Sequence, residues 1–339
     1  MPAEKIDLAL KLEADRMVNS TFDQTEVEPE RMVIISERQG YENEPLFQLG
    51  EQVQAVAFRV HAYHHEVIGD LVDLSTMQRE NLFQHYKKFY QPNNAVLGIA
   101  GDFNTEEMLS RVRELFESIS NGYEIKRMIR PEPVQNGERQ VVVEGTGETC
   151  YIQIAHHIPE STHEDFFALT VLDSLLTGPS NLNVFGGGIS NKTSRLYQAL
   201  VDTELAISIQ GGVHATIDPY MHIMTGIVHP QKKPKDVLDA VEEQLNSLHD
   251  NAPPIQEVDR AVKQARALFA YGSESITNQA FWLGFSEMFA TYDWFLDCLD
   301  NLAKVTPADV QRVARKYLLS KNRVVGIYLP SSTSMEQSQ

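Results

Sequence analysis

The feature that most constrains the fold of this chain is an internal repeat. Residues 82–99 align without a gap on residues 310–327, an offset of 228 residues. In this alignment Lys88 falls on Lys316, and two asparagines, two glycines and several apolar positions also coincide. Self-similarity at a fixed offset is typical of a duplicated structural unit. The chain is therefore expected to contain one module of helices and strands twice.

The repeat also predicts that the first module lacks its front. The second module is expected to open with a strand at Gln140, and the same offset places the matching strand about 88 residues before Met1. The chain instead starts with a pattern typical of a helix, over residues 3–18. We therefore expect the first module to be N-terminally incomplete.

Hydrophobic periodicity and turn residues predict an α+β protein. In the first part we expect helices over residues 3–18, around 30–37, and over 47–60, 78–89 and 105–118, with one buried strand over 95–100. In the second part we expect strands over 140–145, 149–158, 206–212, 222–228 and 323–329, and helices over 163–177, 194–201, 234–249, 256–295 and 307–318.

The breaks between these segments predict four regions. Residues 1–122 form the remainder of the first module, and residues 123–138 form a proline- and glycine-containing linker. Residues 139–330 form the second module. Residues 331–339 form a polar tail that we expect to be disordered.

Composition excludes several classes of partner. The formal net charge of −18 disfavours nucleic acid and anionic membrane surfaces, so neither is expected as a partner. No apolar run approaches the ~20 residues that a membrane helix needs. Cys150 and Cys298 provide neither a disulfide framework nor a paired-cysteine metal site, which favours a reducing, cytoplasmic location.

Two carboxylates lie seven residues apart on one predicted helix, at Glu30 and Glu37. Seven residues are nearly two helical turns, so both side chains lie on one face beside three apolar residues at 33–35. The pattern fits an ordinary solvated helix, and it also fits a helix that lends a carboxylate to a metal. With one more residue of offset Glu37 falls on Arg266, so the second copy keeps the helix without the carboxylate.

Histidines elsewhere are weaker candidates for metal ligands. His61, His64, His65 and Glu66 are clustered, but their spacing does not fit a pair of ligands on one helix, and we expect a loop. Residues 156–157 are two histidines in one predicted strand, so their side chains are expected to point to opposite faces.

Three further patterns have ordinary structural explanations. Residues 186–193 resemble a phosphate-binding loop, but Asn191 replaces the glycine before Lys192. Ser194 has no evident base beside it in the sequence. An aromatic stripe on the helix around Trp282 fits core packing, with the lining of a peptide chamber as the alternative.

Several short segments, in order along the chain, together resemble the pitrilysin/insulinase family of zinc peptidases. They are Leu12-Glu13-Ala14-Asp15-Arg16-Met17, Glu30-Arg31-x5-Glu37, His61-x-Tyr63-x4-Ile68-Gly69, Tyr90-x-Pro92-Asn93-Asn94-Ala95, Gly101-Asp102-Phe103 and Ser194-Arg195-Leu196-Tyr197. The resemblance implies duplicated α/β modules, each with an antiparallel-rich sheet packed by helices, the first of them truncated in this chain.

The resemblance also implies a zinc site. Members of the family hold Zn²⁺ with the two histidines of an inverted His-x-x-Glu-His motif and a glutamate about 77 residues later. Glu37 matches this third ligand, and Glu30 matches an acidic residue that supports the site from outside the ligand shell. No His-x-x-Glu-His occurs in the 339 residues, so the chain alone is predicted to bind no catalytic zinc and to be inactive.

Two functions fit this resemblance. The first is the C-terminal portion of a zinc metalloendopeptidase that acts on a peptide substrate, with Arg195 and Tyr197 as candidate substrate contacts. The second is a non-catalytic family subunit that holds substrate or pairs with an active partner. Val201 and Ile207 stand where well-known members place Arg and Tyr, which favours the second function. A second family subunit or a homodimer is the implied partner in both cases.

Overall fold

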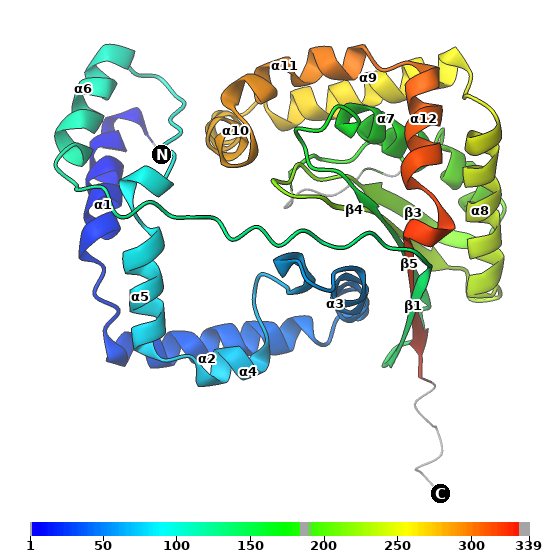
Figure 1. Cartoon of the computed structure of the whole chain (residues 1–339), viewed down its shortest axis with the longest axis horizontal. Coiled ribbons are helices and arrows are strands. Elements are labelled where there is room, and N and C mark those ends of the chain that lie inside the picture. Colours follow the sequence, from blue (N-terminus) through cyan, green and yellow to red (C-terminus); the bar gives the residue numbers. More distant parts are fainter. Residues whose placement is uncertain (1, 184–188, 190, 332–339) are drawn as a thin grey trace, which may run out of the picture.

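A computed structural model describes residues 2–183, 189 and 191–331, and it divides into two halves joined by an extended linker (Figure 1). The first half (residues 2–116) is helical. The second half (residues 139–330) is a five-stranded sheet with helices packed on it. No helix in the described part of the chain is long and apolar enough to cross a bilayer.

The first half is built of helices, but residues 22–29 are not the polar break that the sequence predicts, because α2 already begins at Gln24. Its elements are a 3-10 turn (Ala3–Lys5), α1 (Ile6–Asn19), α2 (Gln24–Tyr41), α3 (Pro45–Ala57), a 3-10 turn (Ala62–His64), α4 (Leu71–Thr76), α5 (Arg79–Phe89), a 3-10 turn (Pro92–Asn94) and α6 (Thr105–Phe116). The Asn104 side chain caps α6 by accepting from the backbone N–H groups of Glu106 and Glu107, whereas the sequence alone leaves Asn104 and Thr105 as alternatives. The short helix α4 is not predicted from the sequence.

The predicted strand over residues 95–100 is wrong. Its backbone is extended at Ala95, but no strand among the described residues pairs with it. Val96 and Leu97 are 50% and 47% exposed, whereas their repeat counterparts Val324 and Val325 are 1% and 3% exposed. A strand is defined by its partner, and here the sequence supplies only the extended conformation.

The sheet of the second half has the strand order β1-β5-β2-β4-β3. Its strands are β1 (Arg139–Gly145), β2 (Tyr151–Ile158), β3 (Ala206–Gly212), β4 (Tyr220–Val228) and β5 (Arg323–Pro330). Only the β1–β5 pair is parallel, so the sheet is antiparallel-rich as predicted. All five predicted strands of the second half are confirmed.

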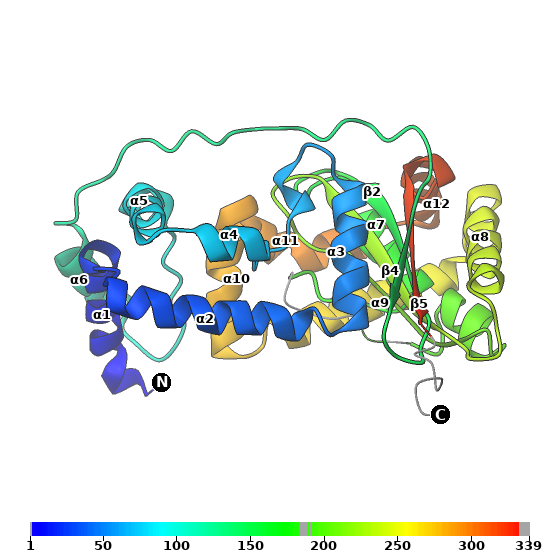
Figure 2. The same ribbon diagram turned by 90° about the horizontal axis from the view of Figure 1, so that it is seen from below.

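Helices cover both faces of this sheet (Figure 2). One face packs on the large core beneath α7 (Phe166–Leu176), α8 (Pro234–Asp250), α9 (Ile255–Gly272), α10 (Ile276–Phe289), α11 (Tyr292–Ala303) and α12 (Pro307–Tyr317). The other face packs on α3 through Leu49, Val53 and Phe58. The predicted helical region over 256–295 is thus three helices, and the segment after Ser194 contains a π-helical turn at Tyr197–Val201.

The duplication is visible in the order of the elements. Helices α2 and α9 match from end to end at an offset of 231 residues, and α3 and α10 begin at the same offset. Helices α5 and α12, and the 3-10 turns after them, match at the offset of 228. The offset of 231 places Glu37 opposite Leu268, so the sequence alignment on Arg266 was two residues short.

In each half, one glycine lies directly against a helix of the other half. Gly326 in β5 lies so close to α3 that an added Cβ would meet Val53 Cγ2 at 2.3 Å. Gly98, its repeat counterpart, lies so close to α10 that an added Cβ would meet the Ala280 carbonyl oxygen at 2.6 Å. Both positions therefore need glycine because a helix of the opposite half packs directly on the backbone.

The linker is extended and is held at two points. Residues 117–138 form no helix or strand, and in both views they cross alone from α6 to β1 (Figures 1 and 2). The Glu132 carboxylate accepts the backbone N–H groups of residues 59, 60 and 61 at 2.9, 2.8 and 3.1 Å. Arg127 pairs with Asp218 at the end of the β3–β4 connection. Ser331, the first residue of the predicted tail over 331–339, donates its backbone N–H to the Gly145 carbonyl oxygen at 2.7 Å, and residues 332–339 lie outside the described residues.

Candidate functional site

Glu37 lies on the exposed face of α2, near its C-terminal end. Its carboxylate accepts a hydrogen bond from the Tyr41 hydroxyl at 3.0 Å, which raises the pKa of Tyr41. The neighbouring Arg38 is buried and donates to Glu42 and Glu51, the latter on α3. The helix thus turns Arg38 inward and leaves Glu37 available to another group.

Glu30 borders an apolar cavity on the same helix. The cavity has a volume of about 330 Å³ and lies between α2, α4 and α5. Its other lining residues are Phe22, Glu26, Val27, Arg31, Ile34, Leu74, Met77 and Leu82. The Arg31 guanidinium spans one wall by donating to the Leu74 carbonyl oxygen at 3.1 Å.

The second half shows which element packs on the helix face that corresponds to the Glu30 face of α2. Ala261, which matches Glu30 at the offset of 231, is 2% exposed because α7 lies on this face of α9. The Ser174 hydroxyl of α7 donates to the Ala261 carbonyl oxygen at 3.0 Å. In the first half, no described element occupies the position that corresponds to α7.

The described residues do not form a metal site by themselves. Within residues 2–183, 189 and 191–331, no group of three His, Cys, Asp or Glu side chains is arranged to hold an ion. His61 pairs with Asp218 at 3.2 Å, and the rings of His64 and His65 contact each other. Glu37 supplies one carboxylate, whereas a zinc site needs at least three protein ligands.

Arg195 and Tyr197 both lie at the start of the π-helical segment and are partly buried. The Arg195 guanidinium makes two parallel hydrogen bonds to the Glu257 carboxylate of α9, at 2.6 and 2.7 Å. Two of its five donors are therefore already used within the fold. Ile207 lies on the edge strand β3 and is 53% exposed.

A buried polar cluster beneath the sheet was not predicted from the sequence. The Asp173 carboxylate of α7 contacts the His222 ring at 2.8 Å and accepts from the Ser180 hydroxyl at 2.7 Å. Both partners bind the carboxylate and not each other, so the order differs from a serine–histidine–aspartate triad. Asp173 is 0% exposed, so this cluster stabilises the packing of α7 on the sheet and its carboxylate does not contact solvent. A lone aspartate in the apolar sequence of α7 was the available signal.

The remaining predicted candidates are structural where they are described. His156 alternates along β2 with Ile154 and Ile158 of the large core, whereas His157 packs on Phe58 on the α3 side, so the two rings lie on opposite faces as predicted. Trp282 and Phe289 of the aromatic stripe are buried in the core. Half of the glycine-rich segment over 186–193, namely residues 186–188 and 190, lies outside the described residues.

A protein-family model described as the peptidase M16 inactive domain matches residues 76–265, more than half of the chain. The zinc protease PqqE of Helicobacter pylori is 30% identical over 175 residues, which are 50% of this chain and 39% of that relative. An uncharacterized zinc protease of Mycobacterium leprae is 26% identical over 98% of this chain and 73% of its own length. A probable mitochondrial-processing peptidase subunit beta of Arabidopsis thaliana is 26% identical over 96% of this chain and 61% of its own length.

Solved structures share the fold. A protease from Helicobacter pylori superposes with a TM-score of 0.89 at 23% identity, covering 97% of this chain and 78% of the other. A peptidase M16 inactive domain from Pseudomonas fluorescens superposes with a TM-score of 0.82 at 15% identity, covering 97% of this chain and 76% of the other. The chain thus spans between 39% and 73% of the three sequence relatives and about three quarters of the two solved chains.

Proposed function

The chain belongs to the peptidase M16 family, the zinc peptidases of the pitrilysin/insulinase type, and from that membership we propose that it is the C-terminal portion of a zinc-dependent metalloendopeptidase. In this proposal Glu37 is one zinc ligand, Glu30 supports it, and both histidine ligands come from a polypeptide segment outside this sequence. The proposed substrate is a peptide, and the proposed location is the cytoplasm.

The observation that carries the proposal is the pair of carboxylates on the open face of α2. A helix seated on α2 as α7 is seated on α9 would face Glu30, because Ala261 is the counterpart of Glu30. Glu37 lies about two turns further along the same helix, roughly 10 Å away along its axis. A helix that carries two histidines in this seat would meet both carboxylates from one side.

The test is to restore the missing ligands and measure metal. The DNA upstream of Met1 is expected to encode an in-frame His-x-x-Glu-His about 40 codons earlier, as the family spacing implies. The extended protein is expected to contain one zinc per chain by mass spectrometry and to cleave an unstructured peptide. Glu37→Gln should abolish zinc binding, because a zinc site with two protein ligands is incomplete.

Two further variants make the result specific. Glu30→Gln is expected to weaken zinc binding about 10- to 100-fold, the usual effect of losing a group that supports a ligand. Glu44→Gln, which removes an exposed carboxylate at the start of α3, should leave zinc content unchanged. Full zinc content in the Glu37→Gln protein would refute the assigned ligand.

A second candidate function is a non-catalytic subunit that holds substrate or supports an active partner. It is favoured by the bidentate pairing of Arg195 with Glu257, which leaves fewer donors for a substrate backbone. It is also favoured by Val201 and Ile207, which stand where substrate-binding relatives are expected to carry Arg and Tyr. Under this alternative the extended protein would bind no zinc, and it would become part of an active peptidase only when mixed with a catalytic family member.

A further inference from the structure

The second half holds one buried carboxylate with a set of donors from α12. Asp165, at the turn between β2 and α7, is 0% exposed. It accepts from Lys316 Nζ at 2.7 Å and from the Tyr317 hydroxyl at 2.7 Å, and it also pairs with Arg312. Burial alone would raise the pKa of this carboxyl, but the three donors outweigh burial and hold it well below its usual range.

An asparagine next to α12 fixes the strand that leads to this turn. The Asn322 side-chain amide donates to the Tyr317 carbonyl oxygen at 2.8 Å and to the His157 carbonyl oxygen of β2 at 2.9 Å. One lysine and one asparagine thus bind both ends of a single segment, residues 157–166. This segment runs from a strand through an acidic residue into a helix.

The first half repeats these donors at the offset of 228. Lys88 matches Lys316, and each ammonium lies 4.9 Å from the centre of the aromatic ring that follows it, Phe89 or Tyr317. Asn94 matches Asn322 and donates to the Phe89 carbonyl oxygen at 2.9 Å, as Asn322 donates to Tyr317.

What the first half lacks is the acceptors. Among the residues that the structure describes, Lys88 has no carboxylate partner, and Asn94 makes no bond to a strand carbonyl. The lysine–ring distance and the asparagine hydrogen bond therefore recur in both halves, while among the described residues only the second half contains a segment that these donors bind.

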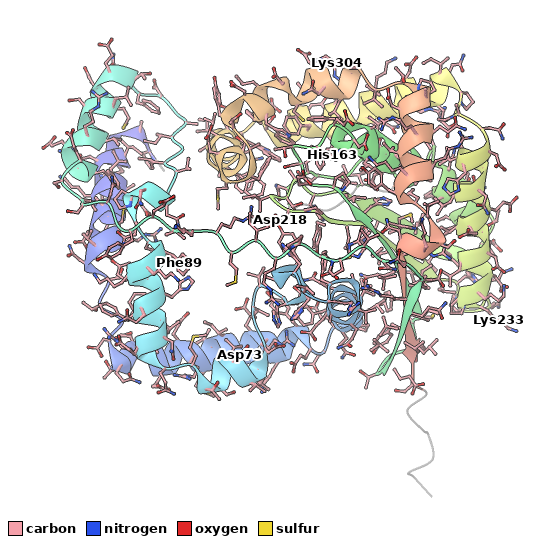
Figure 3. The ribbon with its side chains drawn as sticks, in the orientation of Figure 1. Asp73, Phe89, His163, Asp218, Lys233 and Lys304 are labelled. Atoms are coloured by element: carbon pink, nitrogen blue, oxygen red, sulfur yellow. The ribbon has the colours of Figure 1, made fainter. Side chains whose placement is uncertain are left out.

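The unfilled donors line an open groove of about 1150 Å³ between α5 and the linker. Phe89, labelled at the end of α5 in Figure 3, marks its position. The cationic side chains that line the groove are Lys87, Lys88, Lys126 and Arg127, of which Arg127 pairs with Asp218, and the one lining carboxylate is Glu124. In a chain of net charge −18, this groove is suited to an acidic group.

We propose that Lys88 and Asn94 form a docking site for a polypeptide segment that runs from a strand through an aspartate or glutamate into a helix. The carboxylate binds Lys88, and the carbonyl oxygen at the end of the strand accepts from Asn94. Phe89 and Gln84 replace Tyr317 and Arg312, so the site has fewer donors and binds its segment less tightly than the second half binds Asp165. In the proposed peptidase this segment precedes the histidine-bearing helix, and only that assignment rests on the proposed function.

The docking chemistry can be tested on the present chain without metal. The probe is a fluorescein-labelled peptide with the sequence of residues 156–167, His-His-Ile-Pro-Glu-Ser-Thr-His-Glu-Asp-Phe-Phe, in buffer that contains EDTA. Its partner is the same peptide with Asp165→Asn. Fluorescence anisotropy is measured with the wild type, with Lys88→Met, and with Lys232→Met, which removes an exposed lysine after β4.

The expected result is a thermodynamic coupling between Lys88 and the aspartate. Lys88→Met should weaken binding of the aspartate peptide about tenfold, the range of a charge-assisted hydrogen bond. The asparagine peptide should bind the wild type with the same loss and should show no further loss with Lys88→Met. Lys232→Met should bind as the wild type does.

Three outcomes would overturn the docking site. They are no measurable binding of the aspartate peptide, equal binding by the wild type and Lys88→Met, and an equal loss for both peptides on Lys88→Met. The probe lacks the His-x-x-Glu-His motif, so a failed zinc experiment leaves this result intact. Conversely, failure of the docking experiment leaves the assignment of Glu37 to be decided by zinc content.

Discussion

At the scale of single residues, the most consequential groups are buried histidines. His156 is fully buried opposite His222 in the β2–β4 pair, and neither of its ring nitrogens has a hydrogen-bond partner among the described residues. Burial, with the nearby His222 ring adding to it, lowers the pKa of His156 well below its usual value. Burial likewise lowers the pKa of His214. Both rings are therefore neutral in the folded protein.

These histidines predict that acid destabilises the protein. In the unfolded protein these histidines bind protons once the pH falls below about 6.5. In the folded protein their lowered pKa values keep the rings unprotonated to a lower pH. The free energy of unfolding should therefore be highest above about pH 6.5 and should fall as the pH decreases, by at most about 1.4 kcal/mol per pH unit for each such histidine. Urea denaturation between pH 7.5 and 5 measures this slope.

A substitution assigns the slope to its source. His156→Leu is expected to reduce the loss of stability between pH 7 and 5, because one group that titrates only in the unfolded state has been removed. His85→Leu replaces an exposed histidine on α5 and serves as the control. An unchanged slope in His156→Leu would show that other groups cause the acid sensitivity.

At the scale of elements, Gly326 beneath α3 and Gly98 beneath α10 provide the sharpest test of how the two halves pack on each other. Gly326→Ala should destabilise the protein by about 1–3 kcal/mol, because its new Cβ would meet side chains of α3 at 2.3 and 2.9 Å. Gly98→Ala should cost at least as much, because the atom it meets at 2.6 Å is a backbone oxygen of α10 and cannot rotate away. Thermal denaturation measures both effects.

The matched control is Gly137→Ala in the linker, where an added Cβ meets nothing within 4 Å. Its effect on the free energy of unfolding should lie within about 0.5 kcal/mol. Equal stabilities of the three alanine variants would contradict the described seating of α3 and α10.

Sequence reasoning recovers those elements whose signals are local. The five strands of the second half and most of the helices follow from periodicity, whereas α4 and the division of residues 256–295 into three helices do not. The strand over 95–100 was predicted wrongly because apolar periodicity indicates only an extended conformation, and no strand among the described residues pairs with this segment. The packing of α3 on Gly326 and of α10 on Gly98 was also not predicted. The one local sign of this packing is that the repeat keeps glycine at both 98 and 326. The sequence does not indicate which helix packs on either glycine.

The same limit applies to the candidate site. Glu30 and Glu37 were predicted to share one helix, and they do. The pairing of Arg195 with Glu257 and the cluster around Asp173 join residues that are distant in the sequence. No spacing rule connects such residues, because the fold alone brings them together.

At the scale of the whole molecule, the two halves should stay together when the linker is cut. A specific protease site inserted after Gly122 would sever an extended segment that has few contacts of its own. Leu49, Val53 and Phe58 are at most 1% exposed, and each such buried side chain contributes about 1.5–3 kcal/mol. The cut fragments are therefore expected to elute as one species on size exclusion and to separate only in denaturant.

The controls are the chain with the inserted site left untreated and the unmodified chain treated with the same protease. Fragments that elute separately in native buffer would mean that the contacts of α3 and α10 are too weak to hold the halves together. In that case the covalent linker, rather than the contacts of α3 and α10, would keep the two halves together.

The close approach of α3 to Gly326 and of α10 to Gly98 has a consequence for how this sequence can change over generations. Duplicated segments commonly diverge as independent lineages once each folds alone. Here, a larger side chain at either glycine position is tolerated only if the helix of the other copy that packs on it moves away or carries a smaller residue. Position 98 is therefore tied to Ala280, and position 326 to Val53, so that homologous genes should show correlated replacements within each pair.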